Sequence, residues 1–457
     1  MLSQVDYSII NEIKNKIDKD QLYFSYNDVT KKEGIHNFAR YPATMVPEMQ
    51  KDILEILCAN VDAKSLLDPF MGSGTVLVEG IKNGLDVYGM DINPYAYYLT
   101  KSKLNYLPVA ELEECRNKLI NSIINDDTDY DIHGFDKIDK WFRKDYQNIL
   151  SKIRDRISKI ENLKLRLFFM ISFSDVVTTL KNSQSSTFKL HIKKNDKIES
   201  FNKDAIKEFV NKVDKNIISY KEYINILISK KLIKRIYKTE ENRFRNKVTI
   251  SCDDSRKLKK NLKLRKNSID LIVTSPPYGD NQTTVTYGQF STLPLFWMHD
   301  DDFKSEFNEE LFQNFSAIDR ASLGGKIYSK EIIEKSKLLV KSLSLKKFYD
   351  LMVKFKREDK GRKVVTFIID FYEVLLQMHN VLKVDGYMVF VVGNRRVHNN
   401  IVPFDVIINE LLMDNFEKIT KFDRLIKNKK MASKISNVNN ESVKSMDTEI
   451  ILVFKKK

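Results

Sequence analysis

Residues 274–280 read TSPPYGD, which places a hydroxyl group, two prolines and an aromatic ring in one short segment. The residues before it, 269–273, read IDLIV and are typical of a buried parallel strand. A proline cannot donate to a sheet ladder, and the residue before a proline prefers extended geometry. The chain must therefore leave the sheet here as a stiff loop with free carbonyl groups. Such a loop, with the ring of Tyr278 behind it, is suited to hold a planar amino group.

A second segment, residues 65–75, reads SLLDPFMGSGT and predicts a strand, a glycine loop and a helix that begins at Thr75. Gly72 and Gly74 allow the backbone to approach a ligand closely, and the new helix offers unpaired N–H groups. A strand followed by a glycine loop and a helix is the opening of a nucleotide-binding βαβ unit. A phosphate-binding P-loop is excluded, because no Gly-Lys-Ser/Thr follows.

Acidic residues end two further predicted strands. Asp91 follows the strand 86–90, at the distance from the glycines where a carboxylate suits the hydroxyl pair of a ribose. A solvated aspartate that opens a turn is the alternative for this position. Asp254 follows the strand that begins at residue 248, and its carboxylate could accept a hydrogen bond from an adenine amino group.

The chain has 457 residues, of which 42% are hydrophobic, enough for one large domain or two ordinary ones. Lys and Arg number 77 against 62 Asp and Glu, and the formal net charge of +15 favours a polyanionic partner, nucleic acid before membrane. No run of about 18 apolar residues predicts a membrane span, and the first residues lack the apolar core of a signal peptide. Three widely spaced cysteines form neither a disulfide framework nor a zinc pattern, so we expect no metal site and a reducing cytoplasm.

Two long insertions interrupt the α/β pattern. The first, residues 104–247, is mostly helical and charged, and its part 181–247 holds 18 Lys and Arg against 8 Asp and Glu. This excess predicts a nucleic-acid surface, with a solvated helical face as the alternative. One basic cluster in it consists of Lys230, Lys231, Lys234 and Arg235. The second insertion, residues 299–362, is also charged and largely helical.

The glycine loop and the tetrapeptide 275–278 together resemble motifs of S-adenosylmethionine-dependent amino methyltransferases of nucleic acid. The resemblance is closest to the N4-cytosine DNA methyltransferases of restriction–modification systems. It covers residues 36–102, 248–298 and 363–457. It implies an α/β fold with a doubly wound, mostly parallel seven-stranded sheet, Rossmann-like, with one antiparallel edge strand and two mainly helical insertions. The first and fourth strands would be neighbours at the switch point, which brings the glycine loop beside the proline loop.

The same resemblance divides the chain into a core and its insertions. The core would consist of residues 1–103 with the N-terminal arm, residues 248–298 with the catalytic loop, and residues 363–457, where 419–426 and 448–454 close the sheet. The first insertion, 104–247, is the candidate target-recognition region.

The resemblance also implies S-adenosylmethionine as cofactor and roles for single residues. Tyr41 and Pro42 would help to hold the methionine part, Asp91 the ribose and Asp254 the adenine. The catalytic residues would be Ser275, Pro276, Pro277 and Tyr278. The cofactor-binding residues would be Tyr41, Pro42, Asp68, Pro69, Phe70, Gly72, Ser73, Gly74, Thr75, Asp91, Ile92, Asp254 and Ser255.

The chemistry expected of these residues is direct methyl transfer. An amine conjugated with a heteroaromatic ring is a poor nucleophile, and hydrogen bonds from it to the Ser275 side chain and the Pro276 carbonyl would localise its lone pair and aim it at the sulfonium methyl. The base must leave the duplex to reach such a site, and Tyr278 could stack on it. C5-cytosine methylation is disfavoured, because none of the three cysteines follows a proline. Ser275 favours cytosine, since adenine enzymes usually carry Asp or Asn there; N6-adenine methylation is the alternative.

The implied partners are double-stranded DNA and a cognate restriction endonuclease, in the bacterial cytoplasm and without a membrane. A tRNA methyltransferase shares the proline loop but usually carries a separate N-terminal RNA-binding domain, for which the segment before Arg40 is too short. A methyltransferase of protein side chains would not explain the basic insertions. An inactive DNA-binding subunit is a further alternative, against which the two intact loops argue.

Overall fold

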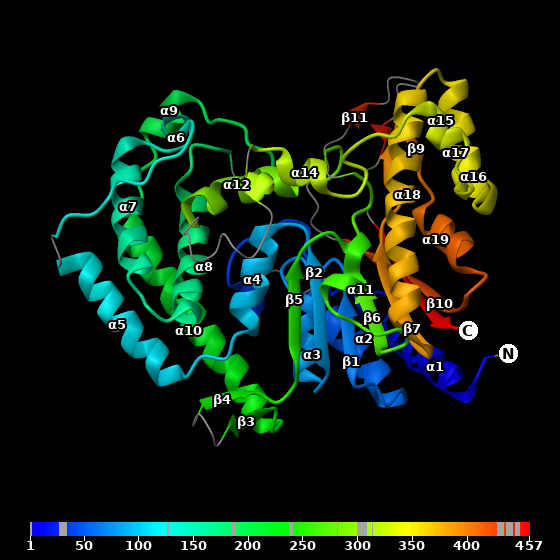
Figure 1. The fold of residues 1–457 in the computed structure, drawn as a ribbon, viewed down its shortest axis with the longest axis horizontal. Coiled ribbons are helices and arrows are strands. Elements are labelled where there is room, and N and C mark those ends of the chain that lie inside the picture. The colour runs from blue at the N-terminus through cyan, green and yellow to red at the C-terminus, as the bar shows by residue number, and fades with distance from the viewer. Residues whose placement is uncertain are drawn as a thin grey trace.

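The computed structural model describes residues 2–26, 34–125, 128–184, 188–236, 241–280, 282–298, 309–312, 314–426, 434–435, 442–443 and 448–457. The strands of its central sheet are Ser65–Asp68 (β1), Asp86–Asp91 (β2), Val248–Cys252 (β5), Ile269–Thr274 (β6), Leu382–Val392 (β7), Phe416–Leu425 (β10) and Thr448–Lys456 (β13). The seven strands follow the order β10-β13-β7-β6-β1-β2-β5 (Figure 1). The predicted mostly parallel, doubly wound sheet is thus confirmed.

The direction of winding reverses between β1 and β6, which are hydrogen-bonded neighbours with Leu66 opposite Leu271. From β1 the sheet continues through β2 to β5, and from β6 it continues to β7, all in parallel. These two strands are the first and the fourth of the sheet along the chain, as expected. The loops that follow them leave the same edge of the sheet side by side, where ligands of doubly wound sheets bind.

The antiparallel strand does not lie at the edge, which corrects one detail of the expected fold. β13 runs antiparallel to both of its neighbours, β7 and β10, and β10 forms the edge. The burial patterns give the reason. Residues 450–454 of β13 are buried without interruption, as a strand covered on both faces requires, whereas buried and exposed residues alternate along β10. The chain therefore forms the outer strand β10 first, and β13 then inserts between β10 and β7.

Helices cover both faces of the sheet, because successive strand residues point to opposite sides. Leu66 belongs to one apolar cluster and Leu67 to the other. The helices of the first cluster include Gln4–Lys19 (α1), Pro47–Asn60 (α2), Thr75–Lys82 (α3) and Pro94–Leu104 (α4). Those of the second include Leu258–Asn261 (α11), Leu343–Lys354 (α17), Glu358–Val381 (α18) and Phe404–Leu412 (α19).

The first insertion forms a group of helices beside the sheet (Figure 1). Its elements are Val109–Asn125 (α5), Ile138–Trp141 (α6), Lys144–Ser158 (α7), Leu163–Leu180 (α8), Asn195–Glu199 (α9), Ala205–Ser229 (α10) and a hairpin of Ile233–Ile236 (β3) and Glu241–Phe244 (β4). The apolar helix α8 lies at its centre and packs against α4, α7, α10 and the helix Tyr287–Met298 (α12). This insertion is mainly helical, and it also contains the hairpin.

The second insertion joins the other side of the molecule. Its described elements are Glu309–Phe312 (η4), Ala317–Ala321 (α14), Lys330–Glu334 (α15), Leu338–Lys341 (α16) and α17, and residues 299–308 lie outside the described part. α14 packs against α12, so the segments after β6 cross above the edge of the sheet at which β1 and β6 end (Figure 1). The helix α18 begins at Glu358, a few residues before residue 362, where the second insertion was expected to end.

One helix, α18, is long and apolar enough by length and composition to cross a membrane. Its apolar side chains, among them Val365 and Phe371, are buried in the cluster against the second face of the sheet. This is the position of a core helix.

Candidate active site

A pocket of about 840 Å³, its open mouth included, lies at the ends of β1, β2, β5 and β6. The predicted residues that line it are Tyr41, Phe70, Gly72, Ser73, Thr75, Asp91, Ile92, Asp254, Ser255, Ser275 and Pro277. The predicted residues outside this lining are Pro42, Asp68, Pro69, Gly74, Pro276 and Tyr278. The glycine loop and the proline loop therefore face one common space.

The glycine loop adopts left-handed backbone angles, with φ of 47° at Gly72 and 77° at Gly74. A Cβ at Gly74 would lie only 2.7 Å from Oγ1 of Thr100. That hydroxyl donates to the Gly72 carbonyl over 2.9 Å, and the buried ammonium of Lys103 donates to the Ser73 carbonyl over 2.7 Å. Because Thr100 and Lys103 lie three residues apart on α4, one face of this helix fixes the loop.

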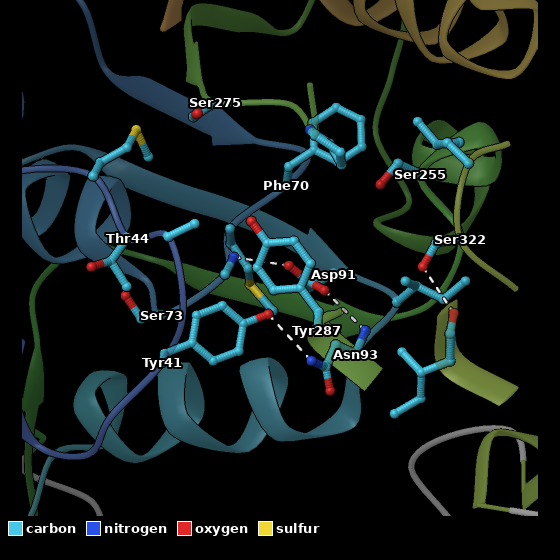
Figure 2. Close-up of a pocket in the computed structure, with 18 of the residues that line it drawn as sticks. Tyr41, Thr44, Phe70, Ser73, Asp91, Asn93, Ser255, Ser275, Tyr287 and Ser322 are labelled. Carbon is cyan, nitrogen blue, oxygen red and sulfur yellow. Dashed lines mark hydrogen bonds between the residues drawn. The ribbon is translucent and has the colours of Figure 1, made fainter. Parts of the chain in front are cut away.

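Asp91 at the end of β2 holds the loop from the other side. Its Oδ2 accepts from the Gly72 N–H and its Oδ1 from the Asn93 N–H, each over 2.9 Å. Burial raises the pKa of this carboxyl to about 6, although the two backbone donors act in the opposite direction. Each oxygen keeps a further lone pair for a ligand hydroxyl. Figure 2 shows Asp91 at the centre of the pocket, beside Tyr41 and Tyr287.

Asn93 is a pocket residue that the sequence indicates only as part of a turn. Its side-chain amide donates to the Tyr41 hydroxyl over 3.2 Å and to Ser291 Oγ over 2.8 Å, while its Oδ1 accepts from the Tyr95 N–H at the start of α4. An asparagine before a proline is a helix N-cap signal, which could have predicted the cap but not the two long-range contacts. Asn93 thus joins the segment at residue 41 to α12.

Asp68 lies behind the pocket and connects the two motif loops. Its Oδ1 accepts from the Phe70 N–H over 3.0 Å and from the hydroxyl of Thr274, the last residue of β6, over 2.6 Å. Complete burial raises the pKa of this carboxyl to about 7. Its Oδ2 is buried without a hydrogen-bond partner in the described structure. The residue therefore sets the relative position of the loops.

Asp254 and Ser255 form the far wall. Ser255 donates to the Pro69 carbonyl over 2.5 Å, which ties the end of β5 to the loop after β1. Both carboxylate oxygens of Asp254 accept from Arg256, and Arg256 also pairs with Asp370 on α18 over 3.0 Å. The predicted adenine acceptor is therefore held rigidly, because both of its oxygens already accept hydrogen bonds from the backbone and guanidinium of Arg256.

The proline loop presents only part of the tetrapeptide to the pocket. Ser275 and Pro277 line it, whereas the Tyr278 ring packs against the second apolar cluster. The Tyr278 hydroxyl donates to Glu449 Oε1 over 2.8 Å, and Glu449 in turn pairs with Arg424 on β10. The start of β13 thus holds the proline loop from the side away from the pocket. The expectation that Tyr278 stacks on a base stays a prediction.

The second insertion supplies pocket residues that no sequence motif indicates. They come from α14 and the turn after it: Ile318, Ala321, Ser322 and Leu323. Thr44 and Met45 next to the segment at residue 41 complete one side, and Tyr287 completes the other. These positions follow from the tertiary fold alone.

The basic cluster at residues 230–235 lies away from the pocket, and its role in nucleic-acid binding stays a prediction. The Lys230 ammonium donates over 3.0 Å to the carbonyl of Lys82, at the end of α3 that is remote from the glycine loop. The hairpin that follows adjoins the start of β5, where Val248 pairs with Val87. Figure 1 shows this hairpin opposite α12 and α14. The number of charges in a segment does not indicate at which end of the strands that segment lies.

Comparison with known proteins decides the family. The model of a DNA methylase family matches residues 5–102 and 269–457. The chain belongs to this DNA methylase family. It is 32% identical over 469 residues to the Type II methyltransferase M.MvaI of Kocuria varians, covering 99% of this chain and 98% of that protein.

Two other matches are weaker. The Type II methyltransferase M.MjaII of Methanocaldococcus jannaschii is 26% identical over 148 residues, which cover 30% of this chain and 27% of that protein. The rRNA methyltransferase AviRa from Streptomyces viridochromogenes aligns with 94% of this chain and 96% of its own, at 9% identity and a TM-score of 0.29, which is too low to support an argument. The family match and the similarity to M.MvaI show that this chain is a methyltransferase enzyme of a family that acts on DNA.

The pocket of the DNA methylase fits S-adenosylmethionine, the methyl donor that its family implies. The left-handed Gly72 brings backbone against the pocket, Asp91 lines it with carboxylate oxygens that can accept from ligand hydroxyls, and Asp254 lines the same space. Ser275 lies on the same wall as Phe70 (Figure 2). Among the described residues, no group of His, Cys, Asp or Glu could hold a metal ion.

Proposed function

We propose that this protein is a site-specific DNA methyltransferase that modifies the exocyclic N4 amine of cytosine. The observation that carries this proposal is the common pocket: Ser275 of the proline loop and Gly72 and Asp91 of the cofactor loops line one space. A methyl donor held by the second group and an amine held by the first would meet there without a covalent enzyme intermediate. Serine at the first position of the tetrapeptide supports cytosine over adenine.

The residues of the chain would act mainly by positioning. S-adenosylmethionine, when bound, supplies an electrophilic methyl group on its sulfonium sulfur. The Ser275 hydroxyl and the Pro276 carbonyl would accept hydrogen bonds from the amine, which concentrates electron density on its nitrogen. Pro276 and Pro277 keep this loop stiff, so that the acceptors need no reorganisation during the reaction. Tyr278, held by Glu449, would give the flipped base a flat surface.

The biological setting belongs to the same proposal. Double-stranded DNA in the cytoplasm would be the substrate, and a restriction endonuclease of the same sequence specificity would be the partner that methylation blocks. The similarity to a Type II methyltransferase over nearly the whole chain supports this setting.

The test is to identify the methylated nucleoside. DNA from a methylation-free host that expresses the protein should contain N4-methylcytosine by nucleoside mass spectrometry, at one sequence found by modified-base sequencing. Ser275→Ala should lower kcat by about 10²–10³-fold, because one preorganised polar contact is lost, while cofactor affinity stays near that of the parent. N6-methyladenine as the product would overturn the base assignment, and full activity of Ser275→Ala would remove the loop from the chemistry.

A further inference from the structure

Lys181, at the C-terminal end of α8, is a buried cation without a counter-ion in the described part of the chain. Its side chain is 6% exposed, and its ammonium lies 5.4 Å from the centre of the Phe290 ring. No carboxylate among the described residues lies within ion-pair distance of it. An isolated buried ammonium is costly, because the protein must replace its hydration. Burial together with the positive charges of Arg40 and Lys193 lowers the pKa of Lys181 to about 8.

The groups around Lys181 are also cationic. The Lys193 ammonium donates to the Lys181 carbonyl over 3.0 Å. Arg40 binds Asp175 through its Nε over 2.9 Å, and the same carboxylate pairs with Lys212 over 3.5 Å. Asp175 is thus engaged by Arg40 and Lys212, and no ion pair of Lys181 or Lys193 is found among the described residues. Two neighbouring cations without a carboxylate partner favour an anion from outside the chain.

This cluster adjoins the active-site pocket. Arg40 precedes Tyr41, which lines the pocket, and the Phe290 ring under Lys181 packs against the Tyr41 ring at 6.5 Å. The ring of Phe188, which is 47% exposed, packs against Phe290 from outside at 6.0 Å. Neither Arg40, Lys181 nor Lys193 lines the pocket itself. An anion held there would lie beside the mouth of the pocket.

We propose that Lys181, flanked by Arg40 and Lys193, binds a phosphodiester of the DNA backbone next to the flipped base. This inference rests on the proposed DNA substrate and assigns the contact that orients it. A phosphate would supply the counter-ion that Lys181 does not find among the described residues. Phe188 would face a neighbouring base or sugar. The carboxylate of the methyl donor is a different source of negative charge, but it would have to leave the pocket to reach Lys181.

The experiment compares Lys181→Met with Lys234→Met, a matched control. Both changes remove one ammonium, but Lys234 is exposed on β3. This strand lies near the start of β5, away from the strand ends that carry the pocket. In titrations of a labelled duplex that contains the methylation site, Lys181→Met should weaken binding about tenfold at about 0.1 M salt and reduce the slope of log K against log salt by about 0.9. Lys234→Met should leave both values near those of the parent. Lys181→Arg should restore most of the affinity.

Thermal melting and cofactor titration distinguish a DNA contact from a folding defect and from a cofactor contact. Lys181→Met should melt at the same temperature as the parent or above it, because an unpaired buried charge is removed. Lys193→Met, at a less buried position, repeats the test should Lys181→Met fold poorly. An unchanged salt slope in both variants would overturn the proposal, and so would a parallel loss of S-adenosylmethionine affinity, which would assign the anion to the methyl donor. DNA binding by the parent without methylation would count against the proposed reaction and leave the phosphate test valid.

Discussion

At the scale of residues, two carboxylates, Asp68 and Asp91, position the loops of the pocket in different ways. Asp68 is sealed behind the two loops and holds them together, whereas Asp91 holds the glycine loop and also reaches the ligand space. Burial raises the pKa of both groups, to about 7 and about 6. Both carboxyl groups therefore titrate close to neutral pH, and we expect the affinity for a cofactor to depend on pH. Substitution of each residue tests its contribution to that dependence.

The first prediction at this scale concerns Asp91. The ionised carboxylate is the better acceptor for ribose hydroxyls, so S-adenosylmethionine affinity should increase as the pH rises through about 6, the folded-state pKa. Asp91→Asn should lose that step and bind about 10- to 100-fold more weakly at pH 7.5, because a hydrogen bond to a charged group contributes about 1.5–3 kcal/mol. Isothermal titration between pH 5 and 8 measures both effects. If the pH dependence persists in Asp91→Asn, another group is responsible for it, and Asp68 is the next candidate.

At the scale of elements, the proline loop is held by a strand that lies far away in sequence. Glu449 at the start of β13 accepts from Tyr278 and faces Arg424 across the β10–β13 pair. Tyr278→Phe keeps the ring but removes this hydroxyl, so kcat should fall roughly tenfold, about 1.4 kcal/mol, with little change in cofactor affinity. Tyr387→Phe is a matched control, because its hydroxyl donates to Asp6 away from the pocket. Equal kcat in both variants would show that the hydroxyl does not position the loop.

The elements also show what a sequence can and cannot predict. The strand before Asp68, the left-handed glycines and the strand before Ser275 carry local signals, since each depends on neighbours within a few residues. The order of β10 and β13 depends on which strand is covered on both faces, which local patterning left undecided. The cations at 230–235 and Lys181 belong to one basic stretch of the sequence. In the structure, Lys230 contacts the end of α3 that is remote from the pocket, whereas Lys181 lies over Phe290 beside it. Distance along the chain carries no information about that difference.

At the scale of the whole molecule, the pocket is assembled from both halves of the chain. The core supplies the loops after β1, β2, β5 and β6, and the second insertion supplies α14 and Ser322. A second connection runs below the pocket, where Asp370 on α18 accepts from Arg256 and from the Gly324 N–H, which follows α14. Any ligand that fills the pocket therefore contacts segments that are not neighbours in sequence, and its binding should tighten their association.

This arrangement predicts that S-adenosylmethionine stabilises the insertion as well as the core. A ligand selective for the folded state raises the melting temperature, and a hundredfold excess over Kd contributes about 2.7 kcal/mol. Hydrogen–deuterium exchange should slow in the loops 70–74 and 91–93 and, to a similar degree, in residues 317–324. Protection should be weak in β3 and β4, which lie near the starts of the parallel strands, away from the pocket, and serve as the internal control.

Leu323 allows the coupling between the insertion and the core to be tested directly, because its side chain joins the pocket to the second apolar cluster. Leu323→Ala should weaken cofactor binding and abolish the coupled protection of α14 while the loops of the core stay protected. Protection confined to the core in the parent protein would mean that the second insertion only borders the pocket and takes no part in binding.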